Sequence, residues 1–181
     1  MEKGIQIQLA TLNDIEELAQ FARKAFTAAY EEEMGKDAVQ NHLEIELTDD
    51  KFSTMMNMDA FYLAIYNSKL AGFAQIGSVD LSYHDYLINF DPNGVEIRRL
   101  YVLSKYQNQG IGSMLIEKST SDPLVKQARN IYLTTWESNY GAQELYERHG
   151  FEKVGQFPEY DENGELNGYE YILAKSNRQP S

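Results

Sequence analysis

The sequence of 181 residues contains no cysteine and only four prolines. Without cysteine the chain can form no disulfide, no cysteine-rich zinc site and no thiol nucleophile. It also has no apolar run of bilayer length and no basic leader followed by an apolar stretch, so we expect a cytoplasmic protein without a membrane partner. No linker-like composition divides the chain, which favours a single domain over residues 1–176 and a flexible tail over residues 177–181.

Basic residues are scarce. The chain has 16 Lys and Arg against 28 Asp and Glu, for a formal net charge of −12. Nucleic acid is therefore not an expected partner, because neutralising phosphates needs clustered basic side chains. The charge suits a cationic substrate, although solubility alone would also account for it. The three histidines, His42, His84 and His149, lack metal-ligand spacing, so no metal site is predicted.

Apolar periodicity predicts alternating strands and helices. In the first half we expect a strand over 5–9, a helix capped by Thr11 or Asn13 and running to about Ala29, helices over 36–46 and 50–56, and a hairpin of strands 61–66 and 70–77, followed by a loop over 78–94. In the second half we expect a strand over 95–102, helices over 110–120 and 123–129, a strand over 131–136, a helix after Asn139, and strands 151–157 and 168–174 around a turn at 161–164.

A glycine-containing turn, Gln107 to Gly112, follows strand 95–102 through residues 103–106 and opens an amphipathic helix. Gly110 and Gly112 allow the backbone to approach a ligand closely. The first N–H groups of a helix, aided by the helix dipole, attract anions. The segment is therefore predicted to bind phosphate.

Three classes of phosphate-binding motif are candidates for this turn. A Walker loop needs Lys and Ser or Thr directly after its second glycine, but Ser113 and Met114 follow Gly112. A Rossmann turn needs a third glycine where Leu115 stands. The remaining class binds the pyrophosphate of coenzyme A. The alternative interpretation is an ordinary helix start that contains glycines and binds no ligand.

A second motif runs from Asn139 to Phe151. Asn139 is a good helix N-cap, and Gly150 suits the left-handed position after a helix, where Phe151 can fold back over the last turn. Helical spacing places four residues between them on one face: Ala142, Leu145, Tyr146 and His149.

Together the two motifs resemble the GNAT acetyltransferase superfamily. Gln107, Gly110 and Gly112 fit its Arg/Gln-x-x-Gly-x-Gly/Ala signature, and residues 139–151 fit its N-x-x-A-x-x-x-Y-x-x-x-G-F segment. The resemblance is strongest over residues 95–157. It implies an α/β (α+β) fold with a mixed, mostly antiparallel sheet, splayed at the acetyl-CoA site and flanked by helices. One departure is Asp122-Pro123, which interrupts a helix that usually runs unbroken in the superfamily.

The resemblance also implies roles for individual residues in acetyl transfer from acetyl-CoA to a primary amine. Tyr146 would protonate the departing thiolate, or else be a core tyrosine. Glu96 would act as a base through water, or else be a rim carboxylate or ion-pair partner. The implied cofactor contacts are Leu100, Tyr101 and Val102 on the pantetheine arm, then Gln107, Asn108, Gln109, Gly110, Ile111, Gly112 and Ser113 on the pyrophosphate, with Asn139 and Tyr146 in addition.

The acceptor is the least defined part of this interpretation. Acidic side chains gather at Glu31 to Glu33 and at Glu44, Glu46, Asp49 and Asp50. Such groups are most often solvated helix faces, but in the superfamily this region overhangs the acceptor site. The sequences of residues 96–102 and 136–139 are similar to those of PaiA-type polyamine acetyltransferases, so a spermidine-like amine is the expected acceptor.

Without cysteine, the transfer is expected to be direct, within a ternary complex. Two alternatives remain: a protein Nα- or lysine acetyltransferase, and a non-catalytic CoA-binding regulator. Homodimers are common in such families, although no residue identifies an interface.

Overall fold

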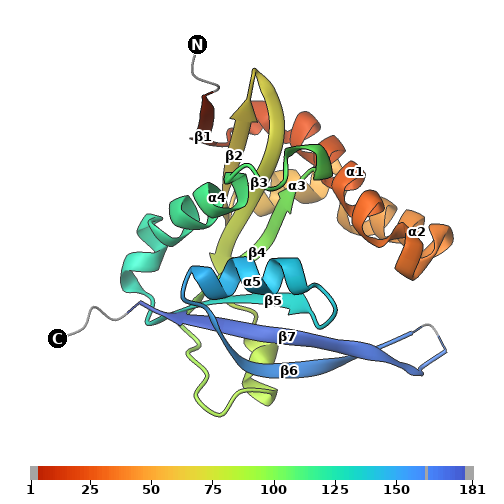
Figure 1. Ribbon diagram of the computed structural model, residues 1–181, viewed down its shortest axis with the longest axis vertical. Coiled ribbons are helices and arrows are strands. Elements are labelled where there is room, and N and C mark those ends of the chain that lie inside the picture. The colour runs from red at the N-terminus through yellow and green to blue at the C-terminus, as the bar shows by residue number, and fades with distance from the viewer. Residues whose placement is uncertain (1–3, 162, 178–181) are drawn as a thin grey trace. The chain divides into compact units, whose positions relative to one another are not determined.

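The computed structural model describes residues 4–161 and 163–177, and the chain forms two compact units (Figure 1). The first unit comprises residues 1–75 and 99–115, and the second comprises residues 76–98 and 116–181. The single domain expected over residues 1–176 stays a prediction, and residues 178–181 of the expected tail lie outside the described residues.

Seven strands form one mixed sheet in the order β1-β2-β3-β4-β5-β7-β6. Their bounds are β1 (Ile5–Leu9), β2 (Ala60–Tyr66), β3 (Lys69–Ser78), β4 (Val95–Val102), β5 (Asn130–Trp136), β6 (Glu152–Tyr160) and β7 (Leu166–Ser176). The pairs β1–β2, β5–β7 and β6–β7 are antiparallel, whereas β4–β5 is parallel. The mixed, mostly antiparallel α/β fold predicted from the resemblance is confirmed.

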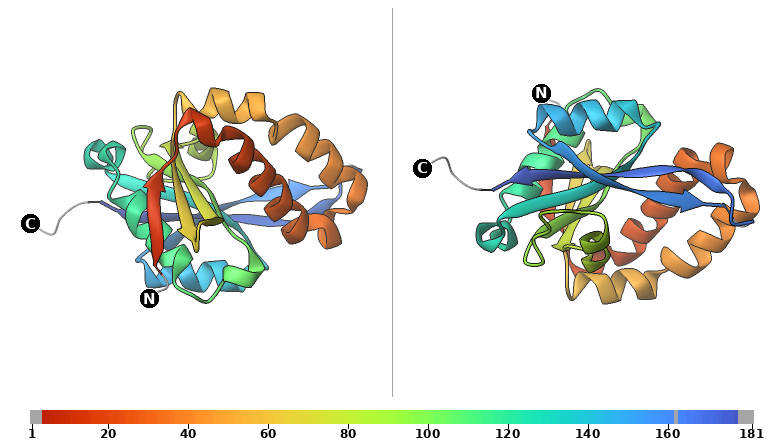
Figure 2. Two further views of the ribbon diagram at one scale, coloured as in Figure 1. Left: turned by 90° about the horizontal axis from the view of Figure 1, so that it is seen from above. Right: turned by 90° about the horizontal axis from the view of Figure 1, so that it is seen from below.

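The helices of the first unit are η1 (Leu12–Asp14), α1 (Ile15–Met34), α2 (Lys36–Glu46), α3 (Asp49–Met56), η3 (Ser104–Tyr106) and the start of α4 (Ile111–Thr120). Of these, α1, α2 and α3 pack against β2 and β3 through a shared apolar core. Helices α2 and α3 run back along α1 (Figure 2). The helical spacing of Leu18, Ala22 and Phe26 turns one face of α1 to Phe52 and Phe73 in this core.

The start of α1 was predicted better than its end. Thr11 caps the preceding turn, because its backbone N–H and its hydroxyl both donate to Asp14 Oδ2, at 2.7 and 2.9 Å. The helix was expected to end near Ala29 but continues to Met34. It ends only at Gly35, whose φ of 80° breaks the helical backbone.

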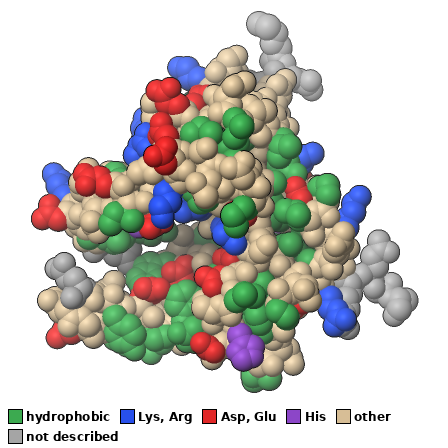
Figure 3. Space-filling model, turned by 180° about the vertical axis from the view of Figure 1, so that it is seen from behind, with side chains coloured by type: hydrophobic (Ala, Val, Ile, Leu, Met, Phe, Trp, Pro, Cys, Tyr) green, Lys and Arg blue, Asp and Glu red, His purple; other side chains and the backbone are tan. Residues whose placement is uncertain are grey.

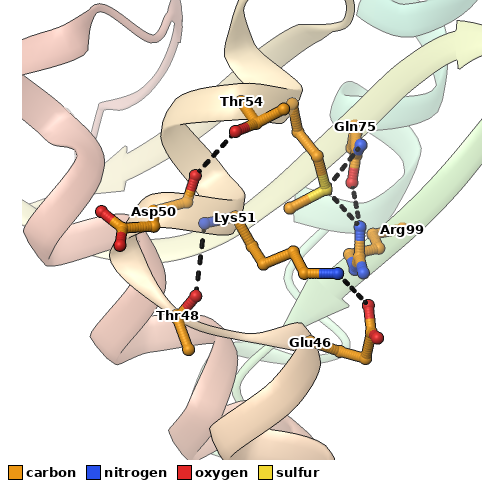
Figure 4. A network of polar contacts seen from close by, with 8 residues as sticks. Glu46, Thr48, Asp50, Lys51, Thr54, Gln75 and Arg99 are labelled. Atoms are coloured by element: carbon orange, nitrogen blue, oxygen red, sulfur yellow. Dashed lines mark hydrogen bonds and ion pairs between the residues drawn. The ribbon is translucent and has the colours of Figure 1, made fainter.

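A buried polar network joins α3 to β3 and β4 in the first unit (Figure 4). The Gln75 amide donates to Asp59 Oδ2 at 2.6 Å and accepts a hydrogen bond from Arg99 Nη1, while Arg99 also contacts the sulfur of Met55. Asp59 and Gln75 are both buried. Gln75 therefore bridges a carboxylate and a guanidinium in a place where an unpaired charge would be costly.

In the second unit the sheet has α5 (Tyr140–Arg148) on one face of β5–β7 and residues 78–94 on the other (Figure 2). Strand β5 pairs with β7 along its whole length, from Asn130–Ser176 to Trp136–Glu170. Within this unit's described residues, the parallel ladder of β4 and β5 joins two pairs, Val95–Ile131 and Glu96–Tyr132. So short a ladder between two long strands agrees with the opening of the sheet that was predicted.

Two segments of the second unit differ from the prediction. Residues 78–94, expected as a loop, contain the short 3₁₀-helix η2 (Leu81–Asp85). Residues 123–129, expected as an α-helix, form a 3₁₀-helix η4 (Pro123–Gln127), with Asp122 Oδ1 accepting from Leu124 N at 2.7 Å. The cap and proline positions were correct, but the helix ends at Gln127, two residues earlier than expected, and the next strand begins at Asn130.

Candidate functional site

The glycine turn adopts a left-handed backbone at two positions. Asn108 has φ of 57° and Gly110 has φ of 82°, immediately before α4 begins at Ile111. A Cβ atom built on Gly110 would meet nothing within 4 Å. Position 110 therefore favours glycine because a residue with a side chain is strained in this left-handed backbone conformation. A lack of space for a side chain is not the reason.

The start of α4 leaves backbone N–H groups without an acceptor inside the helix. The N–H of Met114 donates to the carbonyl of Gly110 at 3.0 Å, which closes the first turn of a ten-residue helix. The N–H groups of residues 111–113 precede this bond and have no acceptor inside the helix. Such N–H groups and the helix dipole attract anions in general, and the binding of a phosphate by residues 107–113 stays a prediction.

Side chains and backbone tie this turn to the end of β4. Gln107 Nε2 donates to the Val102 carbonyl at 3.1 Å, and Leu103 N donates to the Ala71 carbonyl at 3.2 Å. Gly72 lies so close to Tyr101 that a Cβ there would be 2.6 Å from the Tyr101 carbonyl oxygen. The backbone proposed to receive the pantetheine arm is thus held in a fixed position.

Glu96 lies in the second unit and is buried, not at a rim. Its Oε1 accepts a hydrogen bond from the Tyr83 hydroxyl at 2.7 Å, and its Oε2 accepts from Asp80 N at 3.1 Å. Burial raises the pKa of Glu96 above its ordinary value, although these two hydrogen bonds oppose the rise. Burial and the Glu96 carboxylate also raise the pKa of Tyr83, so Tyr83 stays a hydrogen-bond donor.

Tyr83 was not predicted as a site residue. It belongs to η2, within a segment expected to be an irregular loop, and its partner Glu96 is thirteen positions away in the chain. No local pattern connects the two side chains. Only the packing of η2 onto the sheet reveals the contact.

The second motif has the local structure that its residues predicted. Asn139 Oδ1 accepts from Ala142 N at 3.2 Å and caps α5. Gly150 has φ of 81°, and Phe151 N returns to the Tyr146 carbonyl at 3.1 Å. The Tyr146 side chain is buried, with its ring centroid 6.2 Å from that of Phe151. The catalytic and cofactor roles of Asn139 and Tyr146 stay predictions.

The predicted site residues are divided between the two units. Gln107, Asn108, Gln109, Gly110, Ile111, Gly112 and Ser113 lie together in the first unit, next in the chain to Leu100, Tyr101 and Val102. Glu96, Asn139 and Tyr146 lie in the second unit. In that unit Tyr146 belongs to α5. Tyr83, which is hydrogen-bonded to Glu96, belongs to residues 78–94 on the opposite face of the sheet (Figure 2).

Several acidic residues of the first unit are already paired. Lys51 Nζ lies 3.5 Å from Glu46 Oε2, and Arg23 Nη1 lies 3.2 Å from Asp49 Oδ1. Glu31 and Glu32 instead help to line an open hollow of about 500 Å³ at the junction of α1 and α2, together with Thr27, Ala28, Gly35 and Lys36. On the face in Figure 3, acidic and basic side chains are interspersed among hydrophobic ones.

The histidines have different surroundings. His42 stacks on Phe26 with ring centroids 4.1 Å apart, and burial lowers its pKa, as it does for His149. The described residues contain no group of three or more His, Cys, Asp or Glu side chains arranged to hold a metal ion. Among the helices of this part of the chain, none has the length and hydropathy of a bilayer span.

Comparison with known proteins agrees with the fold. Residues 15–151 match the Acetyltransferase (GNAT) family, and the chain belongs to that family. A relative from Lactobacillus delbrueckii subsp. lactis, described as an uncharacterized N-acetyltransferase in the pepI 3′ region, is 23% identical over 155 residues, which are 84% of this chain and 87% of the relative.

Two solved structures have the same fold. PaiA N-acetyltransferase from Thermoplasma acidophilum, crystallised with coenzyme A, has a TM-score of 0.72 at 18% identity and covers 96% of this chain and 99% of its own. A GNAT acetyltransferase from Streptococcus pneumoniae has a TM-score of 0.69 at 23% identity, with the same coverages. The chain is an acetyl-CoA-dependent N-acetyltransferase.

Proposed function

We propose that the protein transfers the acetyl group of acetyl-CoA directly to a small cationic primary amine within a ternary complex. The observation that carries this proposal is the left-handed Gly110 at the start of α4, where the N–H groups of the first helical turn would bind a diphosphate. Residues 107–113 would hold that diphosphate. The absence of cysteine supports direct transfer, because no thiol exists to carry the acetyl group.

On the donor side, backbone groups of Leu100, Tyr101 and Val102 would bind the pantetheine arm. The Val102 N–H would face the thioester carbonyl, where a donor stabilises the negative charge that develops during transfer. Asn139 would contact the cofactor through its remaining amide hydrogens. Tyr146 would protonate the departing thiolate, since an ordinary phenol keeps its proton at neutral pH.

On the acceptor side, Glu96 would remove a proton from the incoming ammonium, either directly or through water. An alkylammonium with a pKa near 10.4 must lose a proton to attack, which costs about 4–5 kcal/mol at pH 7. Burial raises the pKa of Glu96, which makes its carboxylate a better base than an exposed one.

The proposed acceptor is a polyamine or a similar small cation. The formal charge of −12 would attract such a molecule, and Glu31 and Glu32 line the open hollow at the junction of α1 and α2. The resemblance of residues 96–102 and 136–139 to PaiA-type polyamine acetyltransferases supports this class of acceptor. Cytoplasmic location and a homodimeric state are proposed alongside it from the sequence and the family resemblance.

A panel of amines with acetyl-CoA, followed by thiol release, tests the proposal. Spermidine and spermine should give the highest kcat/KM, and E31Q/E32Q should raise the KM for polyamines while leaving kcat unchanged. Turnover on protein N-termini or lysine peptides, with none on polyamines, would instead identify a protein acetyltransferase. Binding of acetyl-CoA without turnover on any amine would indicate a non-catalytic regulator.

A further inference from the structure

A hydrogen bond closes the two ends of segment 78–94 in the second unit. The backbone N–H of Val79 donates to the Gly94 carbonyl at 3.2 Å, so the segment leaves the sheet and returns to it at one place. Near its start, Asp80 Oδ1 accepts a hydrogen bond from Ser82 N at 2.8 Å and caps η2. The short helix η2 therefore has a defined position at its beginning.

The same segment packs closely against the sheet. A Cβ atom on Gly94 would lie 2.6 Å from a ring carbon of Tyr132 on β5, and one on Gly155 of β6 would lie 2.5 Å from the Leu87 side chain. Asp91 N also donates to the Tyr132 hydroxyl at 3.0 Å. Glycine at positions 94 and 155 lets the segment lie directly on the strands, and this close packing limits its movement.

Two hydrogen-bond donors to the Glu96 carboxylate come from this segment. The Tyr83 hydroxyl donates to Oε1 at 2.7 Å, and Asp80 N donates to Oε2 at 3.1 Å. The Tyr83 ring is buried and stacks on Phe157 with ring centroids 6.2 Å apart. A carboxylate has about four acceptor positions, so each oxygen of Glu96 has a second lone pair that can take a proton.

We propose that Tyr83 is a positioning residue, which holds the Glu96 carboxylate in the orientation that accepts a proton from the acceptor amine. The proposal rests on the proposed role of Glu96 as the base. In that step an N–H bond of the ammonium breaks, and its proton passes to a Glu96 oxygen, directly or through water. The electron pair stays on the nitrogen, so a neutral amine and a neutral carboxylic acid result. Tyr83 donates its hydrogen bond before and after this transfer and loses no proton.

The charged and polar groups around Glu96 determine the direction in which each of them shifts its ionisation. Burial raises the pKa of Glu96, and the hydrogen bonds from Tyr83 and Asp80 N oppose this rise. The charge of Arg98 on β4 also lowers the pKa of Glu96, whereas the Asp80 carboxylate raises it. On β7, the Glu96 charge in turn raises the pKa of Glu170. The Tyr83 hydroxyl and the Asp80 charge therefore act on Glu96 with opposite signs.

The variants Y83F and D80N test this role, because they should shift the acid limb of kcat/KM in opposite directions. Y83F keeps the ring and loses the hydroxyl, so the pKa of Glu96 should rise and the limb should move to higher pH. The plateau of kcat/KM should also fall about tenfold, because the carboxylate loses its fixed orientation. D80N keeps an oxygen for Ser82 N and the backbone N–H for Glu96 but removes the charge, so the limb should move to lower pH.

Y86F is the matched control for Y83F. Tyr86 contacts the same Phe157 ring, with centroids 5.5 Å apart, and its side chain is exposed, so Y86F should keep the profile of wild type. If E96Q abolishes activity while the acid limb of Y83F coincides with that of Y86F, the positioning role is overturned and the proposed function is left intact.

A second measurement needs neither an acceptor amine nor a Y83F chain that folds. In the wild-type protein, carbon-13 NMR should show the Glu96 carboxyl carbon and the Tyr83 Cζ atom titrating with one midpoint, because the phenol donates to the carboxylate. E96Q should abolish this change at Tyr83. A wild-type protein without turnover on any amine would defeat the proposed function, yet the shared midpoint would still be measurable. A Tyr83 signal that does not change as Glu96 titrates would overturn the inference.

Discussion

The side-chain amide of Gln107 donates a hydrogen bond to the backbone carbonyl of Val102, 3.1 Å away. It thereby links the first residue of the glycine turn to the last residue of β4. The bond engages the carbonyl of Val102, whereas the proposed contact with the thioester uses the Val102 N–H.

Replacing Gln107 with alanine should loosen this link. Gln107 is exposed, so the loss of unfolding free energy should be about 0.5 kcal/mol, at the low end for a hydrogen bond. Coenzyme A should bind several-fold more weakly, because the turn would have to be ordered on binding. Isothermal titration calorimetry measures this change, and an unaltered dissociation constant would count against the role of Gln107 in shaping the turn.

The handedness of Gly110 can be tested against a matched glycine elsewhere. Gly110 and Gly164 have φ of 82° and 79°, and a Cβ on either would meet nothing within 4 Å. G110A and G164A should each lower the free energy of unfolding by about 1–2 kcal/mol, the cost of a left-handed alanine. Only G110A should weaken coenzyme A binding. Equal affinities in the two variants would contradict the diphosphate site.

Tyr146 is predicted to act in chemistry more than in binding. Y146F should lower kcat by about a hundredfold or more if the phenol protonates the thiolate, while the dissociation constant of acetyl-CoA changes little. The phenylalanine ring keeps the packing against Phe151. Y140F is the control, because Tyr140 lies on the same helix and is exposed. Pre-steady-state thiol release measures the step, and a Y146F enzyme as fast as Y140F would remove Tyr146 from the mechanism.

The pH dependence of the enzyme should follow Glu96. Its pKa in the folded protein is raised above the ordinary 4.5 by burial, so kcat/KM should fall on an acid limb that lies above pH 4.5. E96Q should lose both the activity and this limb. A kcat/KM profile that stays flat down to pH 4.5 would exclude Glu96 as the base.

The same raised pKa has a consequence for stability. A carboxyl whose pKa is higher in the folded state binds its proton more tightly there, so its contribution to stability declines as the pH rises from 4.5 through the raised value. The difference in unfolding free energy between wild type and E96Q should therefore shift in favour of E96Q as the pH rises. Urea denaturation at several pH values measures this difference.

Local patterns predicted most of the secondary structure. The alternation of residues 5–9 and the amphipathic repeat of residues 36–46 gave the observed bounds of β1 and α2. Asn139 and Gly150 marked the two ends of α5, because capping depends on residues close in the chain. The glycine turn was predicted for the same reason.

Contacts between distant residues could not be predicted in this way. Arg99 and Asp59 meet through Gln75, and Tyr83 meets Glu96, only because strands and helices far apart in sequence pack together. The burial of Glu96 was missed for this reason, since the alternation of β4 does not show what covers each face. The 3₁₀ form of η4 was missed because its cap and its proline mark where a helix begins but do not distinguish a 3₁₀-helix from an α-helix.

The positive φ of Gly110 has a consequence for chemical synthesis of the protein. Because a D-residue prefers a φ near the 82° of Gly110, D-alanine should adopt this backbone without the strain that L-alanine would suffer. With D-alanine at this position, the unfolded chain has fewer conformations than it has with glycine, so folding loses less conformational entropy. The semisynthetic protein should therefore be more stable than the natural chain. Its turn would be held, before any coenzyme arrives, in the conformation to which coenzyme A is proposed to bind.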